Sequence, residues 1–365
     1  MTGRQRILAT LRHEEPDRVP IAPRVWAWLM AEHGAQDLGT HLRAFPDLDQ
    51  MYPVEDGTLN LLDVFPEHYD LPGVRVEQRK SQQGDFVAVE RTFHTPTGKL
   101  SDRILVPPNG REFGVTPNPV RTEHLVKGPD DLAALRYILA PVNTRYDFLA
   151  DLRRQMGERG VVMVVVRCAL DHNAGHARDV ADLMVDYYDN RPFFDELIDL
   201  FHRRSMAQIK AALEGGAEFI FGTWYFASLS AGWSPAIFAE VFVPLIREHV
   251  ELTHRYGACY DYYDDGRLDA SMELADLNVA QPVKAGADPR RRPGKSHLRR
   301  RIVHHIGRNL LESVKLVDLL ERERRRRRDS DAPHDAKFVR PLRRDDEKHH
   351  HEKNEAEEDV SEHGQ

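Results

Sequence analysis

The feature that most constrains the fold is an alternation of apolar strands and long helices between residues 161 and 283. Val161 to Val166 is an apolar, mostly β-branched run, which is typical of a strand buried on both faces. The segments after it alternate in kind: helix over 177–214 with a break near Asn190 to Pro192, strand over 218–222, helix from Ser234 to about Arg255, strand over 258–262, helix over 269–277 and strand over 279–283. This alternation predicts parallel βα units and an α/β fold.

Two architectures share this alternation, a (β/α)8 barrel and an open doubly wound sheet. No GxGxxG follows any predicted strand, which disfavours a dinucleotide-binding sheet, so we expect the barrel. The first half of the chain adds smaller elements. These are a helix over 3–12, a short strand or extended segment over 19–23, a hairpin of 84–93 with 99–106, and a helix that opens at 129–132.

The composition changes near residue 285. Residues 286 to 365 carry 21 Lys and Arg against 17 Asp and Glu, with one aromatic residue, Phe338. Such a segment buries too little apolar surface to offset its ordering entropy. We therefore expect a barrel domain over 1–285 and a charged, low-complexity tail over 286–365. Three interpretations of the tail stay open: a mostly disordered tail with one helix over 308–328, a basic arm for nucleic acid or acidic lipid, and a change of reading frame.

Composition also limits the classes of function. No run approaches 18 consecutive apolar residues, so we expect no membrane span, and the charged N-terminus lacks a signal core, so we expect a cytoplasmic protein. The net charge of -8 argues against nucleic acid as the main partner. Cys168 and Cys259 are too few for a disulfide framework or a four-cysteine zinc site, and we expect no metal centre.

In a βα barrel, functional side chains follow the carboxyl ends of the strands. This rule selects three polar or aromatic clusters here: Arg167 to His176, Thr223 to Ser230, and Tyr263 to Gly266. From them and from the first predicted strand we select eight candidates. The catalytic candidates are Asp264, Asp265 and His172. The substrate-binding candidates are Arg24, Trp224, Tyr225, Ser228 and Tyr263.

Each candidate also has a structural interpretation. Asp264 and Asp265 could act as acid and base or hold a polar substrate, or they could cap the next helix over a turn at Gly266. His172 and His176 have the i, i+4 spacing of a metal pair, or they are loop histidines. The two cysteines could be metal ligands or core residues. Trp224 and Tyr225 could stack on a flat ligand or pack in the core, and Arg24 could meet an anionic group or form a surface ion pair.

Several phrases of the sequence resemble the uroporphyrinogen decarboxylase superfamily, which also contains cobamide-dependent methyltransferases. The phrases are RILATLRHEEPDRVPIAP, RTFHTPTGKL, EHLVKGPDDLAALRYIL, ADLMVDYYDNRPFFDELIDLF, AALEGGAEFIFGTWYFASLSAGWSPAIFAEVFVPLIREHV and GACYDYYDDGRLD. Together they cover most of residues 4 to 283. The resemblance implies a single (β/α)8 barrel with its site at the mouth, and the loop at Ser228 resembles the substrate-binding serine region of the family.

The chain departs from both branches of the family. The arginine-rich RQAGR segment of the decarboxylases is replaced by Pro23 to Trp28, which holds one arginine, and the His-x-Cys zinc motif of the methyltransferases is absent from Ala258 to Asp264. Between the two we favour a cobamide-dependent methyltransferase-like enzyme that acts on a small methylated substrate, with a cobamide or corrinoid protein as partner. Decarboxylation of a tetrapyrrole-related substrate in porphyrin biosynthesis is the alternative.

The family blocks expected after residue 285 are absent, so the barrel is predicted to lack its last one or two βα units. A barrel open in this way would expose apolar strand edges. The tail or a homodimer partner could cover them, and a reading-frame change would explain their absence. Two further hypotheses follow: a non-catalytic barrel remnant, and binding of nucleic acid through the arginine-rich tail.

Overall fold

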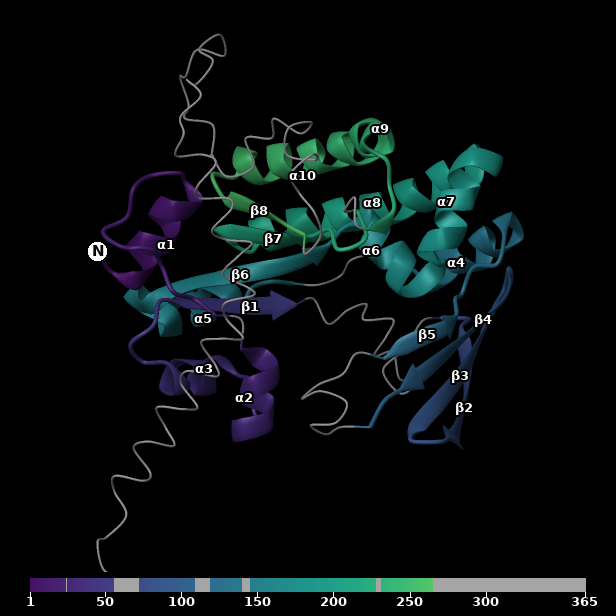
Figure 1. The fold of residues 1–365 in the computed structure, drawn as a ribbon, viewed down its shortest axis with the longest axis horizontal. Helices are drawn as coiled ribbons and strands as arrows, with labels where there is room; N and C mark the ends of the chain where they lie inside the picture. The colour runs from purple at the N-terminus through teal and green to yellow at the C-terminus, as the bar shows by residue number, and fades with distance from the viewer. Residues whose placement is uncertain (24, 56–71, 109–118, 140–144, 228–230, 265–365) are drawn as a thin grey trace, which may run out of the picture. The chain divides into compact units, whose positions relative to one another are not determined.

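The computed structural model describes residues 1–23, 25–55, 72–108, 119–139, 145–227 and 231–264 (Figure 1). The predicted helix over 269–277, the strand over 279–283, the domain boundary at 285 and the charged tail all lie outside these residues. In the part of the chain that is described, no helix is both long enough and apolar enough to cross a membrane.

Four strands form a parallel sheet. In the order of the sheet they are β1 (Gln50–Glu55), β6 (Gly160–Arg167), β7 (Phe219–Thr223) and β8 (Cys259–Tyr263). The order of β6, β7 and β8 in the sheet follows their order in the chain, without the reversal that marks the switch point of a doubly wound sheet. The predicted α/β class is therefore confirmed. Closure into an eight-stranded barrel stays a prediction, because the described residues supply four parallel strands.

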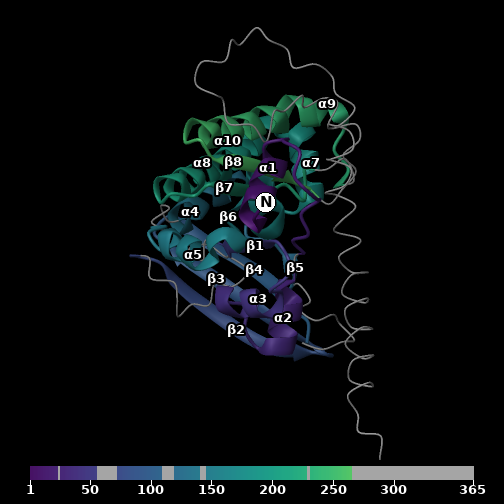
Figure 2. The same cartoon turned by 90° about the vertical axis from the view of Figure 1, so that its left-hand side faces the viewer.

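The two faces of this sheet pack against different partners. Val162, Val164 and Ile220 belong to the large core cluster that includes α8 (Arg191–Glu214) and α10 (Val243–Arg255). Met163 and Phe221 pack on the opposite face, against Ile7 of α1 (Gly3–Leu11). We call these the helix side and the α1 side. Figure 1 and Figure 2 both show α8 and α10 next to the sheet.

The helices follow the sequence signals. The break predicted near residue 190 separates α7 (Val180–Asp189) from α8, and Pro192 lies in the first turn of α8. Ser234 caps the next helical segment, because its hydroxyl accepts the amide of Ile237. That segment comprises α9 (Pro235–Ile237), a π-helical turn (Phe238–Phe242) and α10, and it ends before Gly257, which has a φ of +73°.

A second sheet is antiparallel and has the order β2-β3-β4-β5. Its strands are β2 (Arg75–Gln83), β3 (Phe86–Thr95), β4 (Gly98–Val106) and β5 (Val120–Glu123). The predicted hairpin is β3 with β4, while β2 and β5 were not anticipated. Arg91 of β3 forms a buried ion pair with Asp102 of β4, and Arg121 of β5 pairs with the same carboxylate.

The remaining elements are short. They are α2 (Trp26–His33), α3 (Leu38–Ala44), α4 (Leu132–Ile138), α5 (Leu149–Met156), α6 (Ala169–His172), a π-helical turn (Asn173–Ala177) and single 3-10 turns at Pro129–Asp131 and Gly157–Arg159. The predicted N-terminal helix is α1. Residues 19–23 are extended rather than a buried strand, with Val19 56% and Ile21 45% exposed. The strand that joins the parallel sheet is instead β1, whose mixed sequence QMYPVE carries no strand signal.

Candidate active site

Two rows of side chains cross the α1 side at the carboxyl ends of the parallel strands. The upper row, at the strand ends, consists of Arg167, Thr223 and Tyr263. The lower row consists of Glu55, Val165, Phe221 and Asp261. Alternate residues of a strand share a face, and Phe221 and Tyr263 belong to the α1-side cluster, so both rows lie on that side. In parallel βα proteins this end of the sheet carries the ligand site.

Asp261 is half-buried, and it is the less exposed of the two acidic residues in the rows. Its register neighbour is Phe221, and Cys259 and Tyr263 flank it along the same side of β8. The backbone of Asp261 belongs to the ladder with β7, but no hydrogen bond or ion pair joins its carboxyl group to another described residue. Burial without a compensating partner raises the pKa of this carboxyl to about 6. Asp261 is therefore partly protonated near neutral pH.

Three aromatic rings lie together at the same strand ends. The rings of Phe221 and Tyr263 are 4.9 Å apart between centroids and tilted by 33°. Tyr225 meets Tyr263 edge-on, with centroids 5.4 Å apart. Tyr225 and Tyr263 are partly exposed. They form an aromatic rim next to the polar rows, and substrate binding stays a prediction for these two tyrosines.

Other predicted residues lie buried behind the strand ends. The ring of His172 in α6 stacks on Phe201 of α8, with centroids 5.6 Å apart, and His172 is 4% exposed. Burial, with the charges of Arg167 and Arg204, lowers the pKa of His172 to about 3. Its imidazole is thus neutral at physiological pH and does not exchange protons there, although it can still donate or accept a hydrogen bond.

Asp171 lies beside His172 and is also buried. Its Oδ1 accepts the amide of Phe226 at 3.2 Å, while Oδ2 has no hydrogen bond of normal geometry to the residues described. Burial raises the pKa of this carboxyl, and the nearby hydroxyl of Thr223 lowers it by a smaller amount. Asp171 is a polar group at the ends of β6 and β7, and it is not among the eight candidates selected from the sequence.

Trp224 is fully buried rather than part of the rim. Its indole N–H donates to the hydroxyl of Tyr260 at 2.9 Å, and the same hydroxyl lies 3.1 Å from Nδ1 of His249 in α10. The ring of Trp224 also stacks near Tyr262, with centroids 6.0 Å apart. These contacts tie the end of β7 to α10, and direct contact with substrate stays a prediction for Trp224.

Asp264 lies on the side of Tyr262. The Tyr262 hydroxyl donates to Oδ2 of Asp264 at 3.1 Å, and Asp264 is 7% exposed. Burial and the Asp264 charge both raise the pKa of Tyr262, so this hydroxyl stays protonated. The other three candidates, Arg24, Asp265 and Ser228, lie outside the described residues.

The two cysteines belong to different core clusters. Cys168 packs on the helix side and Cys259 on the α1 side, and both are at most 1% exposed. Burial raises the pKa of each thiol, which keeps the thiolate form that binds metals scarce. His172 and His176 have ring centroids 6.1 Å apart. Among the described residues no three His, Cys, Asp or Glu side chains come together as a metal site.

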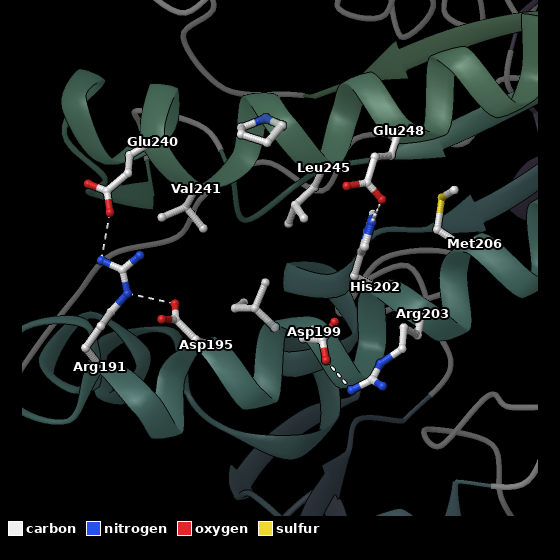
Figure 3. A pocket seen from close by; sticks show the side chains of 12 residues that line it. Arg191, Asp195, Asp199, His202, Arg203, Met206, Glu240, Val241, Leu245 and Glu248 are labelled. Atoms are coloured by element: carbon white, nitrogen blue, oxygen red, sulfur yellow. Dashed lines mark hydrogen bonds and ion pairs between the residues drawn. The ribbon is translucent and has the colours of Figure 1, made fainter.

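A groove of about 580 Å³ lies elsewhere, between α8 and α10 (Figure 3). Its charged side chains pair with one another across or along the helices. The pairs are Arg191 with Asp195 at 2.7 Å and Glu240 at 2.8 Å, Arg203 with Asp199, and His202 with Glu248 at 2.8 Å. Each of the four carboxylates that line the groove thus has a cationic or imidazole partner. We assign the groove to helix packing rather than to chemistry.

One pattern in the sequence points to Asp261, although Asp261 is not among the eight candidates. In the strand CYDYY, alternation places Cys259, Asp261 and Tyr263 on one face, and a lone carboxylate between a cysteine and a tyrosine on a partly buried face is unusual. The pair Asp264-Asp265 drew attention instead because adjacent carboxylates are conspicuous in a linear sequence. Arg167 was part of the first polar cluster, but its role depends on the register between β6 and β7.

Neither a protein-family model nor a curated protein sequence matches this chain. Among solved structures, a methyltransferase from Methanosarcina mazei matches with a TM-score of 0.46 and 13% sequence identity. The match covers 77% of this chain and 75% of that one. A similarity of this size assigns neither a fold family nor a reaction, so the function is argued below from the residues.

Proposed function

We propose that this chain is an enzyme of the uroporphyrinogen decarboxylase superfamily that transfers a methyl group between a small substrate and a corrinoid carried by a partner protein. The observation that carries the proposal is Asp261, a carboxyl group with a pKa of about 6 on the α1 side at the strand ends. A group with a pKa close to the working pH is an effective general acid and base. The sequence resemblance supplies the reaction class, and Asp261 supplies the proton chemistry that this class needs.

The proton balance explains the role of Asp261. When a methyl group leaves an oxygen or nitrogen atom of a substrate, the bond to that atom breaks and its electron pair stays behind. The protonated carboxyl of Asp261 gives its proton to that atom, which makes it a better leaving group. In the reverse direction the Asp261 carboxylate takes the proton back. The apolar surroundings of Asp261 keep a useful fraction of the group protonated.

A bound corrinoid would supply the cobalt centre that accepts or donates the methyl group. The rim of Tyr225, Tyr263 and Phe221 fits such a partner, because it offers an apolar aromatic surface to a large flat ring at the strand ends. Zinc-thiolate chemistry does not fit the described residues, since the two cysteines lie in separate core clusters and neither thiol ionises readily. We therefore derive no step through zinc.

Decarboxylation is the second candidate, because a general acid also protonates the carbon that loses carbon dioxide. The same Asp261 would serve that reaction, and the resemblance to the decarboxylases supports it. The two reactions differ in what they require. Methyl transfer needs an added corrinoid, whereas uroporphyrinogen would be converted to coproporphyrinogen without any added cofactor.

The test uses the full chain with cob(I)alamin under anaerobic conditions and a panel of methylated amines, methyl ethers and methoxylated carboxylic acids. We expect the visible spectrum to show methylcobalamin with at least one substrate. Asp261→Asn should lower the rate by about 100-fold or more, which is the usual size of a general-acid contribution. Asp85→Asn, a change in the exposed turn between β2 and β3, is the matched control and should leave the rate unchanged.

Three results would refute the proposal. The first is conversion of uroporphyrinogen without cofactor and no reaction with cob(I)alamin, which would establish the decarboxylase alternative. The second is no reaction in either assay together with a broad, non-cooperative melt, which would favour the non-catalytic remnant. The third is full activity of Asp261→Asn, which would remove the observation on which the proposal rests.

A further inference from the structure

The antiparallel sheet ends in a long, polar edge strand. In the order β2-β3-β4-β5, the neighbour of β2 among the residues that the structure describes is β3. Figure 1 and Figure 2 both show β2 at the outer border of this sheet. The strand is nine residues long and mostly exposed. An edge strand of this kind presents a row of main-chain donors and acceptors to which another strand can add.

The turn after β2 shows which of its residues face the outer edge. Gln83 and Phe86 lie opposite each other across the two-residue turn of Gly84 and Asp85, where Gly84 has a φ of +58°. The residues that flank such a turn exchange main-chain hydrogen bonds, and bonded positions alternate along an antiparallel pair. The odd-numbered residues of β2 therefore bond to β3. The main-chain groups of Gln78, in the middle of the strand, point to the outer edge.

The exposed face of β2 carries an arginine that can take an acidic partner. Arg79 is exposed and forms no ion pair with another described residue. Its register neighbour on β3 is Glu90, and the carboxylate of Glu90 lies 3.5 Å from Arg103 of β4. The acid next to Arg79 within the sheet is thus shared with another arginine. Arg79 has its other side, toward the edge, open to a second carboxylate.

Glu77 supplies an acid on the same face, two residues before Arg79. It pairs with Arg75 and lies 3.3 Å from Nε2 of His94. The side chains of Arg75 and Glu77 are 65% and 56% exposed, and a carboxylate accepts several hydrogen bonds. Glu77 can therefore keep these contacts and accept a further arginine from outside the chain.

One register of two copies of β2 satisfies both the main chain and the charges. Two identical antiparallel strands meet around a twofold axis, so the residue on the axis faces itself. With Gln78 on the axis, its outward main-chain groups bond to those of Gln78 in the second copy. Glu77 then faces Arg79 of the second copy, in a pair of the kind whose side chains approach most closely. An axis one residue to either side would set Glu77 or Arg79 against itself.

We propose that the edge of β2 is an interface between two copies of this chain, in which the two β2 strands pair antiparallel around Gln78 and Glu77 pairs with Arg79 of the other copy. The two antiparallel sheets then form one continuous sheet. Across it, charges alternate in the order Arg103, Glu90, Arg79 and Glu77 of the second copy. Each copy uses the same patch, so the contact closes at a dimer. This inference does not depend on the proposed function.

The test is sedimentation equilibrium of the full chain at low and at high salt. We expect a monomer–dimer equilibrium at about 1–100 µM, because a contact made by one strand edge is small and small interfaces are weak. Association should weaken at high salt, because exposed ion pairs are screened. A chain that stays monomeric over this range overturns the inference, and the charges of β2 would then serve to keep an exposed edge from pairing.

Exchange of the two charges tests the register. Arg79→Glu and Glu77→Arg each set like charges opposite each other across the axis and should weaken association by about tenfold or more. The double variant, Glu77→Arg with Arg79→Glu, restores opposite charges and should regain the wild-type association. Lys99→Glu is the matched control, because Lys99 is exposed on the same face of β4, away from the edge, and it should leave association unchanged.

Gln78→Pro tests the main-chain pairing. Proline removes an N–H group that points outward, which an edge strand tolerates, so the dimer should be lost while the melting temperature changes little. If this variant does not fold, the charge variants decide the question. The inference is overturned if both single charge variants associate as wild type does, if the double variant does not regain association, or if a folded Gln78→Pro chain still dimerises with wild-type affinity.

Discussion

Acidification should destabilise this protein through its buried histidines, and His172 gives the magnitude. An unfolded imidazole has a pKa of 6.5, and burial lowers the folded value for His172 to about 3. Between these two pH values His172 is protonated in the unfolded chain and neutral in the folded chain. The stability from this residue is therefore complete above pH 6.5 and falls as the pH drops toward 3. Integrating the linkage relation from about pH 7 to pH 5 gives a loss of about 2 kcal/mol.

Other buried groups modify this loss. His176 and His249 have pKa values lowered well below normal by burial and add to it. Asp261 acts in the opposite sense, because its folded pKa of about 6 exceeds the unfolded value of 3.8. Protonation on acidification favours the folded state for that group by about 1 kcal/mol over the same range. Because three buried histidines oppose Asp261, the balance is a net loss of stability on acidification.

The assay is urea unfolding at about pH 7 and pH 5, followed by tryptophan fluorescence and circular dichroism. The wild-type free energy of unfolding should fall between the two pH values, and in His172→Gln that fall should be smaller by about 2 kcal/mol. His33→Gln changes an exposed histidine of α2 and is the control. The reasoning fails if His172→Gln loses as much stability over this pH range as wild type does.

Three further changes test the packing around the strands. Tyr260→Phe removes the hydroxyl that the indole of Trp224 and the imidazole of His249 share. Urea unfolding should show that the free energy of unfolding falls by about 1–3 kcal/mol. An unchanged unfolding midpoint would contradict those hydrogen bonds. Asp102→Asn leaves the buried Arg91 and Arg121 without their carboxylate partner. The free energy of unfolding should fall by about 3–5 kcal/mol in the same measurement. A smaller loss than that of Tyr260→Phe would contradict the buried pairing. Gly160→Ala drives a Cβ into the carbonyl oxygen of Gln50 and should lower the melting temperature, with a cost of about 1–3 kcal/mol. Gly128→Ala, which meets nothing within 4 Å, should leave it unchanged.

The elements predicted correctly are those whose signals are local. The valine-rich run of β6, the Pro192 break before α8, and the Ser234 cap each depend on a few adjacent residues, and the structure reproduces all three. The strand β1 was missed because its sequence is mixed and contains Pro53. It becomes a strand through pairing with β6, which is far away in the sequence. Pairing of that kind leaves no local pattern to read.

The candidate site also combines features that local sequence predicts with features that depend on distant contacts. Sequence position alone brought Tyr225, Tyr263 and the first polar cluster to the strand ends, because every parallel strand ends at the same edge. Sequence position alone did not show which of the residues at the strand ends face the helix side and which face the α1 side. Trp224 and Asp264 follow their strands directly, yet their contacts with Tyr260 and Tyr262 keep them buried.

The two sides of the sheet differ in how their polar groups are paired, and this difference is the reason that we place the proposed chemistry on the α1 side. On the helix side, polar groups at the strand ends are drawn into hydrogen bonds with residues of the covering helices, as Tyr260 is with His249. Groups used in this way stabilise the fold and are not available to a ligand. On the α1 side, Asp261 has no such partner among the described residues, and burial without one is what raises its pKa. This unpaired carboxyl is the reason that we propose Asp261, rather than the more conspicuous Asp264, as the acid.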